Sequence, residues 1–320
     1  MSFLLPPLAL PYRAVTRARR ALYRMGLFRG RSLPRPVVSV GNRSFGGSGK
    51  TPTVIALAEA LLEQQLRVAI LTRGYGRKGK GSAIVEGSDA EAFGDEPVLM
   101  AKRLQDADIV VGADRYESAM FYLREHDCDI FILDDGFQHL QLNRDLDIVI
   151  EDSAAALLRE GRSALVDADV ILLRDGARSA SGRPTFKVSL EPAGVRLGGT
   201  LLPIGTLKEK RVLAFAGLAR NGRFFDLLRH AGAIVVDCMS FDDHHRYSAD
   251  DMNRIRRAAK EKGAALIVTT EKDGVKIQDE SMGIVEVVMH IERLPELVSL
   301  IVSLIAVNGG EGGASDDKRS

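Results

Sequence analysis

The sequence contains a glycine-rich segment of the kind that binds phosphate groups. Its residues follow one another directly: Gly46, Gly47, Ser48, Gly49, Lys50 and Thr51. Glycine lets backbone N–H groups approach a phosphate chain closely. Lys50 would reach the β- and γ-phosphates of a nucleotide, and the hydroxyl of Thr51 would bind Mg²⁺. The strict P-loop pattern has a further glycine where this chain has Ser44, but the segment still predicts a site for ATP with Mg²⁺.

A second candidate for this chemistry is an acidic pair at the end of an apolar run. Residues 130–133 are apolar and lead directly into Asp134 and Asp135. Folds with a P-loop hold Mg²⁺ with an acidic residue at the end of a neighbouring strand. We therefore expect one of these carboxylates to bind the metal and the other to bind a water molecule or a basic group.

The apolar runs predict a parallel sheet between helices. Short continuous apolar runs alternate with amphipathic helical patterns, with strands at 36–40, 67–71, 108–112, 129–133, 147–150 and 169–173, and helices at 51–65, 95–104 and 114–126. Strands that are apolar on both sides are typical of a sheet covered on both faces. This half is therefore α/β, with a P-loop NTPase-type parallel sheet.

A polar, turn-rich stretch at 177–184 marks the boundary to a second, smaller α/β unit. After it, 185–190 and 194–199 predict a two-stranded β-ribbon, and strand and helix patterns then recur from 211 to 270. Ser248 and Asp251 resemble a capping box. The resulting division is a basic helix at 1–35, a nucleotide-binding domain at 36–182, a ribbon at 183–209, a second α/β domain at 210–307 and a disordered tail at 308–320.

Residues 11–28 predict a basic amphipathic helix. Apolar side chains fall on one face (Tyr12, Val15, Ala18, Leu22 and Met25) and basic ones on the opposite face (Arg13, Arg17, Arg20 and Arg24). Two interpretations stay open. The apolar face packs on the protein's own core with the arginines in water, or the helix lies on an anionic membrane surface.

Composition excludes several classes of protein. The formal net charge is +1, which gives no general attraction to nucleic acid. Cys128 and Cys238 are far apart in the sequence, so neither a disulfide framework nor a zinc site is indicated. No apolar run is long enough to span a membrane. We expect a cytoplasmic, monomeric protein with a possible contact to the membrane surface.

Six motifs, taken in order, resemble those of the tetraacyldisaccharide 4'-kinase family. They lie at 40–52, 72–78, 94–97, 133–140, 241–247 and 269–276, and the motifs Asp-Asp-Gly-Phe-Gln-His-Leu and Thr-Thr-Glu-Lys-Asp are the most specific. The resemblance implies two α/β domains joined by a β-ribbon. It also implies transfer of the γ-phosphate of ATP to the 4'-hydroxyl of an acylated glucosamine disaccharide, at the cytoplasmic face of the inner membrane.

The resemblance also implies roles for single residues. Asp95 matches the family's catalytic aspartate and His244 its partner, with His245 as the adjacent alternative, and Lys50 acts on the phosphates. We expect His244 to close onto Asp95 from the second domain. Residues expected to line the nucleotide or acceptor site are Arg73, Tyr75, Arg115, Gln138 and His139. For Glu271, Lys272 and Asp273 we expect a structural or nucleotide-proximal role.

One departure from the family concerns the loop between the strands at 147–150 and 169–173. The family has a longer loop there, of which Leu158-Arg159-Glu160 is the remnant. The P-loop is also compatible with two rival functions: a P-loop NTPase acting as a switch or metal-insertion chaperone, and a membrane-bound nucleotide-binding module without chemistry. The Phe-Asp-Asp-His-His motif and the basic helix favour the kinase over the switch. The presence of Lys50, Thr51, Asp134 and Asp135 disfavours the module.

Overall fold

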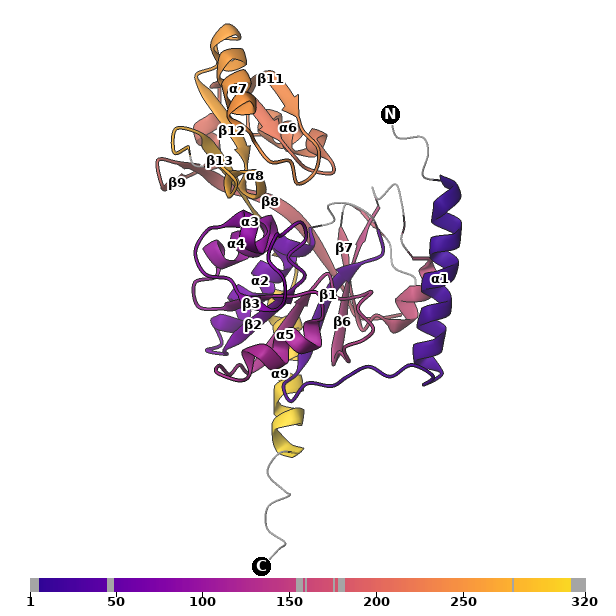
Figure 1. Ribbon diagram of the computed structural model, residues 1–320. Helices are drawn as coiled ribbons and strands as arrows, with labels where there is room; N and C mark the ends of the chain where they lie inside the picture. Colours follow the sequence, from indigo (N-terminus) through magenta and orange to yellow (C-terminus); the bar gives the residue numbers. More distant parts are fainter. Residues whose placement is uncertain are drawn as a thin grey trace, which may run out of the picture.

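The computed structural model describes residues 6–44, 49–153, 158, 160–174, 176–177, 182–277 and 279–311. Figure 1 shows two α/β units, the larger of which carries the N-terminal helix along one side. Within the described ranges the strands form one continuous mixed sheet, in the order β11-β10-β12-β13-β8-β7-β6-β1-β5-β2-β4-β3, with β9 paired to β8. The predicted α/β class is therefore confirmed.

The larger unit is built on a sheet whose strands are parallel except for β3. Its strands are β1 (Val37–Asn42), β2 (Val68–Thr72), β3 (Ala83–Ile84), β4 (Asp108–Val111), β5 (Ile130–Asp134), β6 (Leu146–Asp152) and β7 (Val170–Arg174). β1 lies at the centre, paired with β5 on one side and β6 on the other. All residues of β1, β2 and β5 are buried, because both faces of the sheet are covered.

Helices cover the two faces of this sheet. On one face, α2 (Lys50–Leu62), α4 (Asp95–Arg103) and α9 (Leu294–Glu311) pack on the strands in one apolar core. On the other face lie α5 (Arg115–Tyr122) and the 3-10 helix η1 (Arg162–Asp167), each with its own core cluster. The short helix α3 (Ala90–Phe93) precedes α4. Asp114 caps α5 by accepting hydrogen bonds from the N–H groups of Tyr116 and Glu117.

The connection between the two units differs from the predicted ribbon. Residues 185–197 form one continuous strand, β8 (Thr185–Leu197), and its antiparallel partner is β13 (Gly283–Ile291), far along the chain. The prediction of two strands at 185–190 and 194–199 is therefore wrong. Pro192 lies where the β8–β13 register shifts, and such an irregularity tolerates a residue that cannot donate a backbone hydrogen bond.

The smaller unit continues the sheet with parallel strands. These are β10 (Arg211–Ala216), β11 (Ile234–Ser240) and β12 (Leu266–Thr270); β9 (Thr200–Leu202) and the 3-10 helix η2 (Ile204–Leu207) come before them. Two separate core clusters place α6 (Asn221–His230) and α7 (Ala249–Glu261) on different faces. The predicted capping box of α7 is confirmed, because Ser248 and Asp251 exchange hydrogen bonds. α8 (Glu271–Gly274) follows β12 directly.

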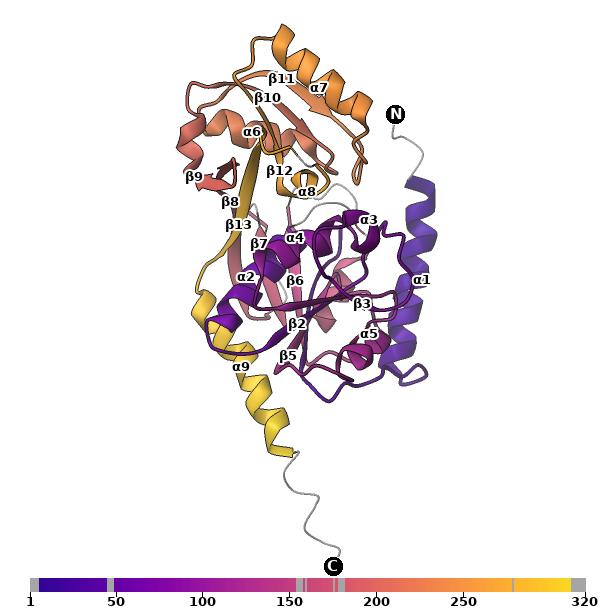
Figure 2. The same cartoon turned by 60° about the vertical axis from the view of Figure 1, so that its left-hand side comes forward.

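The C-terminal helix returns to the larger unit. Leu297, Val298 and Ile301 of α9 are buried in the same core as α2, and Figure 2 shows α9 below β13, away from the smaller unit. The predicted second domain extends to residue 307, which is wrong for α9, because this helix packs in the core of the larger unit. The predicted disordered tail at 308–320 is wrong for residues 308–311, which belong to this helix, and residues 312–320 lie outside the described residues.

Helix α1 (Pro6–Arg24) is attached to the larger unit through arginine rather than through its apolar face. Arg20 is buried: its guanidinium pairs with Glu160 and Asp167, lies over the ring of Phe137 and donates to the carbonyl of that residue. Val15, by contrast, is exposed. The expectation that Arg20 lies on a solvated face is therefore wrong. No described helix has the length and apolar character that crossing a membrane requires.

Candidate active site

The predicted phosphate and metal residues meet at the carboxyl ends of the central strands. β1 and β5 run in parallel with Val40 opposite Asp134, and α2 begins at Lys50 on the same edge. Gly49 caps this helix with a φ of 90°, a conformation that glycine adopts without strain. Gly46, Gly47 and Ser48 lie outside the described residues. The part of the loop that is described begins a helix beside the acidic pair, as the sequence predicts.

Lys50 lies between groups from β1 and from the loop after β5. Its Nζ is 3.4 Å from Oδ1 of Asp135 and 3.4 Å from Oδ1 of Asn42. Thr51 is buried beside it. Asp135 has a φ of 52°, which is uncommon for a residue with a side chain and costs energy. This conformation turns the backbone directly after β5, where the acidic pair lies beside the start of α2.

Asp134 is a buried carboxylate with an incomplete set of partners. Its Oδ2 accepts a hydrogen bond of 3.0 Å from the hydroxyl of Thr72, while its Oδ1 has no hydrogen-bond partner among the described residues. Burial raises the pKa of Asp134 to about 7, and the nearby charges of Glu96 and Asp135 add to this effect. The carboxyl ends of these strands therefore carry negative charge that a bound cation would stabilise.

Two arginines were expected to face the same site. Arg115, at the start of α5, is buried and donates to the carbonyl of Ala113, but its Nε has no partner among the described residues. Burial lowers the pKa of Arg115, and Asp134 and Asp135 oppose that shift. Arg73 is exposed and close enough to Arg115 to repel it. A buried guanidinium with spare donors is suited to binding an anion such as phosphate.

Gln138 and His139 lie on the loop that follows the acidic pair. Nε2 of Gln138 donates to the carbonyl of Asn42 at 2.8 Å, which ties this loop to the end of β1. His139 is half-buried, and the loss of solvent around it lowers its pKa to about 4, with Arg115 adding to the shift. His139 is therefore uncharged near neutral pH. The structure brings both residues to the edge of the sheet where the sequence predicted them.

The predicted pair from the two units is in contact. Asp95 is the first residue of α4, and His244 follows β11 in the smaller unit. Nδ1 of His244 lies 3.2 Å from Oδ2 of Asp95, and the imidazole ring is 5.0 Å from the ring of Tyr75, measured between centroids. His244 has a φ of 62°, so its backbone is strained in the same way as that of Asp135. His245 instead faces Asp251 of α7, at 3.1 Å.

Lys272 contacts the predicted catalytic histidine, whereas the sequence predicts only a structural or nucleotide-proximal role for it. Its side chain is 14% exposed, and its Nζ lies 3.1 Å from Glu96, 3.0 Å from Asp243 and 3.3 Å from Nε2 of His244. An ammonium group only donates hydrogen bonds, so Nε2 of His244 must accept one. That arrangement favours the tautomer in which Nδ1 carries the proton and donates it to Asp95. Lys272 belongs to the Thr-Thr-Glu-Lys-Asp motif, but the sequence of a motif does not show which of its side chains face the site.

Further ion pairs join the two units away from the catalytic pair. Arg103 of α4 pairs with Glu271 at 2.9 Å, and the other oxygen of Glu271 accepts from the N–H of Val287. On another side, Asp152 at the end of β6 pairs with Arg220 of the smaller unit at 3.2 Å. The structural role expected for Glu271 agrees with these contacts. None of the charges on Arg103, Asp152 or Arg220 stood out in the sequence.

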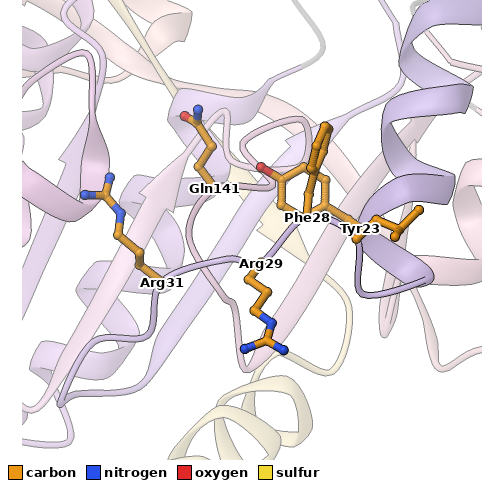
Figure 3. Close-up of a pocket in the computed structure, with 6 residues that line it drawn as sticks. Tyr23, Phe28, Arg29, Arg31 and Gln141 are labelled. Atoms are coloured by element: carbon orange, nitrogen blue, oxygen red, sulfur yellow. The ribbon is translucent and has the colours of Figure 1, made fainter.

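A hollow of about 540 Å³ lies at the end of α1, away from these residues. It is lined by Tyr23, Leu27, Phe28, Arg29, Arg31 and Gln141 (Figure 3). Arg31, one of its two basic residues, already pairs with Asp114 and Glu117. None of the predicted site residues lines this hollow, so it is not the phosphate site.

Comparison with known proteins identifies the family. A model of the family described as tetraacyldisaccharide-1-P 4'-kinase matches residues 1–306. The chain belongs to this family. The tetraacyldisaccharide 4'-kinase of Pelobacter propionicus is 39% identical over 298 residues, which cover 86% of this chain and 82% of that protein. The enzyme of the same name from Geobacter sulfurreducens is 39% identical over 341 residues, covering 97% and 92%.

A solved structure shows the same fold. The crystal structure of LpxK from Aquifex aeolicus in complex with ATP has a TM-score of 0.80 and 36% sequence identity, covering 94% of this chain and 98% of that one. The chain is thus an ATP-dependent 4'-kinase of lipid A synthesis, and the resemblance found in the sequence is confirmed. The rival interpretations as a switch and as a module without chemistry are not retained.

Proposed function

We propose that Asp95 and His244 act together to activate the 4'-hydroxyl of a tetraacyldisaccharide 1-phosphate, while Lys50 and Arg115 bind the phosphates of ATP. The observation that carries this proposal is the 3.2 Å contact between Asp95 and His244 across the two units. It lies beside the phosphate site, because Glu96, the residue after Asp95, is close enough to Asp134 to raise its pKa. A cleft between domains is a common place for such a site.

Transfer to a hydroxyl needs an in-line oxygen and a group that takes its proton. As the bond from the 4'-oxygen to the γ-phosphorus forms, the bond from that phosphorus to the bridging oxygen breaks and ADP leaves. The hydroxyl proton moves to Asp95, through Oδ1, the oxygen that His244 does not hold. Lys50 and Arg115 stabilise the negative charge that develops on the transferred group. Arg73, Tyr75, Gln138 and His139 stay predicted contacts of the nucleotide or acceptor.

Mg²⁺ fits the residues at the carboxyl ends of β1 and β5. Oδ1 of Asp134 is buried without a partner among the described residues, and the charges of Glu96 and Asp135 add to the burial that raises the pKa of Asp134. Among the described residues no three acidic, histidine or cysteine side chains are placed to hold a metal ion by themselves, but Mg²⁺ with a nucleotide needs only one or two carboxylates besides phosphates and water. Asp134, Asp135 and Thr51 would hold the ion, which neutralises phosphate charge when bound.

A lipid substrate requires contact with a membrane, and α1 offers a surface for it. Apolar side chains on this helix and just after it are exposed, with Val15 at 66%, Met25 at 63% and Leu27 at 67% exposure. Because Arg20 attaches the helix to the body, the apolar side is left free to enter a lipid interface. We assign the protein to the cytoplasmic face of the inner membrane, as a peripheral enzyme. A monomeric state stays a prediction.

The proposed transfer is tested with γ-labelled ATP and an acylated glucosamine disaccharide 1-phosphate in detergent. We expect label at the 4' position of the acceptor, and a reduction of about 10²–10³-fold in Lys50→Ala, since a main source of charge stabilisation is lost. Lys260→Ala, an exposed lysine of α7, is the matched control. Label released as inorganic phosphate, regardless of acceptor, would mean that the chain is a hydrolase.

The metal assignment predicts a magnesium-dependent defect. Asp134→Asn replaces a carboxylate ligand by a weaker amide, so activity should fall by about 10²-fold and recover in part at high Mg²⁺. Asp129→Asn makes the same change at the opposite end of the same strand, where the carboxylate pairs with Arg67. Equal magnesium dependence in the two variants would move the metal site away from Asp134.

The membrane assignment predicts that the exposed apolar side chains near α1 carry lipid binding. Val15, Met25 and Leu27, changed together to Ser, should weaken co-sedimentation with anionic vesicles by at least tenfold, at about 1 kcal/mol or more for each side chain that no longer enters lipid. Leu201 and Ile234, at 43% and 47% exposure, are exposed apolar residues of the smaller unit, and their change to Ser is the control. Vesicle binding that is the same in both variants rules out this surface.

A further inference from the structure

A buried lysine lies beside the catalytic pair. Lys276, which follows α8, has only 7% of its side chain exposed. Its Nζ is 2.8 Å from Oδ1 of Asp273 and 3.6 Å from Oδ2 of Asp95, and it lies 5.2 Å from the ring centre of Tyr247. A buried ammonium is costly unless anionic groups surround it. Here the two carboxylates come from different units of the protein.

Asp273 holds Lys276 in place. Its carboxylate is buried and accepts hydrogen bonds from the N–H of Gly217 at 2.9 Å and from the hydroxyl of Thr270 at 2.8 Å. Gly217 has no room for a side chain, since a Cβ there would lie 2.9 Å from the carbonyl oxygen of Asp242 and 3.1 Å from Oδ1 of Asp273. The backbone therefore packs closely around Asp273 and fixes the carboxylate with which Lys276 forms its ion pair.

Both groups that hold Asp95 act on the same oxygen. Nδ1 of His244 and Nζ of Lys276 lie 3.2 Å and 3.6 Å from Oδ2, and no described residue hydrogen-bonds Oδ1. A carboxylate held through one oxygen has a fixed orientation, and its second oxygen stays available to accept a proton. This is the geometry that a general base needs.

We infer that Lys276 is a positioning residue for phosphoryl transfer, which holds Asp95 through Oδ2 and leaves Oδ1 to take the proton of the acceptor hydroxyl. The inference rests on the role proposed above for Asp95. It adds a second link, besides His244, from the smaller unit to the base. Lys276 itself touches neither substrate nor the transferred phosphate in this account.

The charge of Lys276 also bears on the ionisation of Asp95. Burial by itself raises the pKa of Asp95, but the hydrogen bond from His244 and the charges of Lys276, His244 and Lys272 outweigh it and lower the pKa below its usual value. The charged groups that act on Asp95 are His244 from the loop after β11, Lys272 from α8 and Lys276 after α8, with Glu96 next to it on α4. Tyr247 is also near enough for the charge of Asp95 to raise the pKa of its hydroxyl. Removing one cation should raise the pKa again, so that Asp95 becomes protonated, and inactive as a base, at a higher pH.

The test compares Lys276→Met, which removes the charge, with Lys276→Arg, which keeps it. In Lys276→Met we expect kcat to fall by about 10–100-fold with little change in KM for ATP. The acidic limb of kcat/KM should move to higher pH by about one unit, because an opposite charge at this distance lowers a carboxyl pKa by about 1–3 units. Lys276→Arg should restore the position of that limb. Lys260→Met, on the exposed face of α7, is the control for loss of a positive charge.

Thermal melting identifies any variant that fails to fold, and Lys276→Gln, which keeps a hydrogen-bond donor, is then assayed in place of Lys276→Met. An unchanged acidic limb in a folded uncharged variant overturns the inference. Asp95→Asn separates this result from the parent proposal. If Asp95→Asn is inactive, adding Lys276→Met should cost nothing further, and an extra loss would give Lys276 a separate role. If Asp95→Asn stays active, the base assignment fails whatever Lys276 does.

Discussion

The structure depends on opposite charges meeting across the boundary between its two units. Asp95 and Glu96 of the larger unit face His244, Lys272 and Lys276 of the smaller one. Such contacts are strong only where water is largely excluded, and removing one partner leaves a buried charge unpaired. The distance between Asp95, the proposed base, and His244 therefore depends on the relative position of the two units. The ion pair of Arg103 with Glu271 and that of Asp152 with Arg220 support the same arrangement.

At the carboxyl ends of β1 and β5, where the phosphates are expected to bind, negative charge is not fully compensated, in contrast to the paired charges between the two units. Asp134 and Asp135 face the cations Lys50 and Arg115, and Glu96, whose charge also acts on Asp134, pairs with Lys272. Burial raises the pKa of Asp134 for the same reason that it favours a bound cation: both reduce uncompensated negative charge. Phosphates with Mg²⁺ would bring both signs of charge to this edge. Asp95 lies next to Glu96, and the lowered pKa of Asp95 keeps the proposed base ionised beside the proposed metal site.

The sequence predicted those parts of the fold that depend on local patterns. The strands were found because continuous apolar runs identify strands buried on both faces, and Ser248 identified the start of α7. The prediction of two adjacent ribbon strands was wrong because β8 pairs with β13, a strand far along the chain, and a local sequence pattern cannot show such a pairing. The prediction that Arg20 of α1 lies in solvent was wrong because Glu160 and Asp167 compensate the charge of this buried arginine. The motifs named the site residues, but Lys272 and Lys276 needed coordinates, since their roles depend on contacts between units.

In the proposed mechanism Asp95 and His244 act as one unit across the domain boundary, and a double-mutant cycle in kcat measures the coupling between them. Residues that act as a unit have non-additive effects. We predict that Asp95→Ala and His244→Ala each lower kcat strongly with little change in the apparent affinity for ATP. The double variant should be scarcely slower than the slower single variant, and His245→Ala should be mild. Losses that multiply in the double variant, or a harmless His244→Ala, would contradict the account.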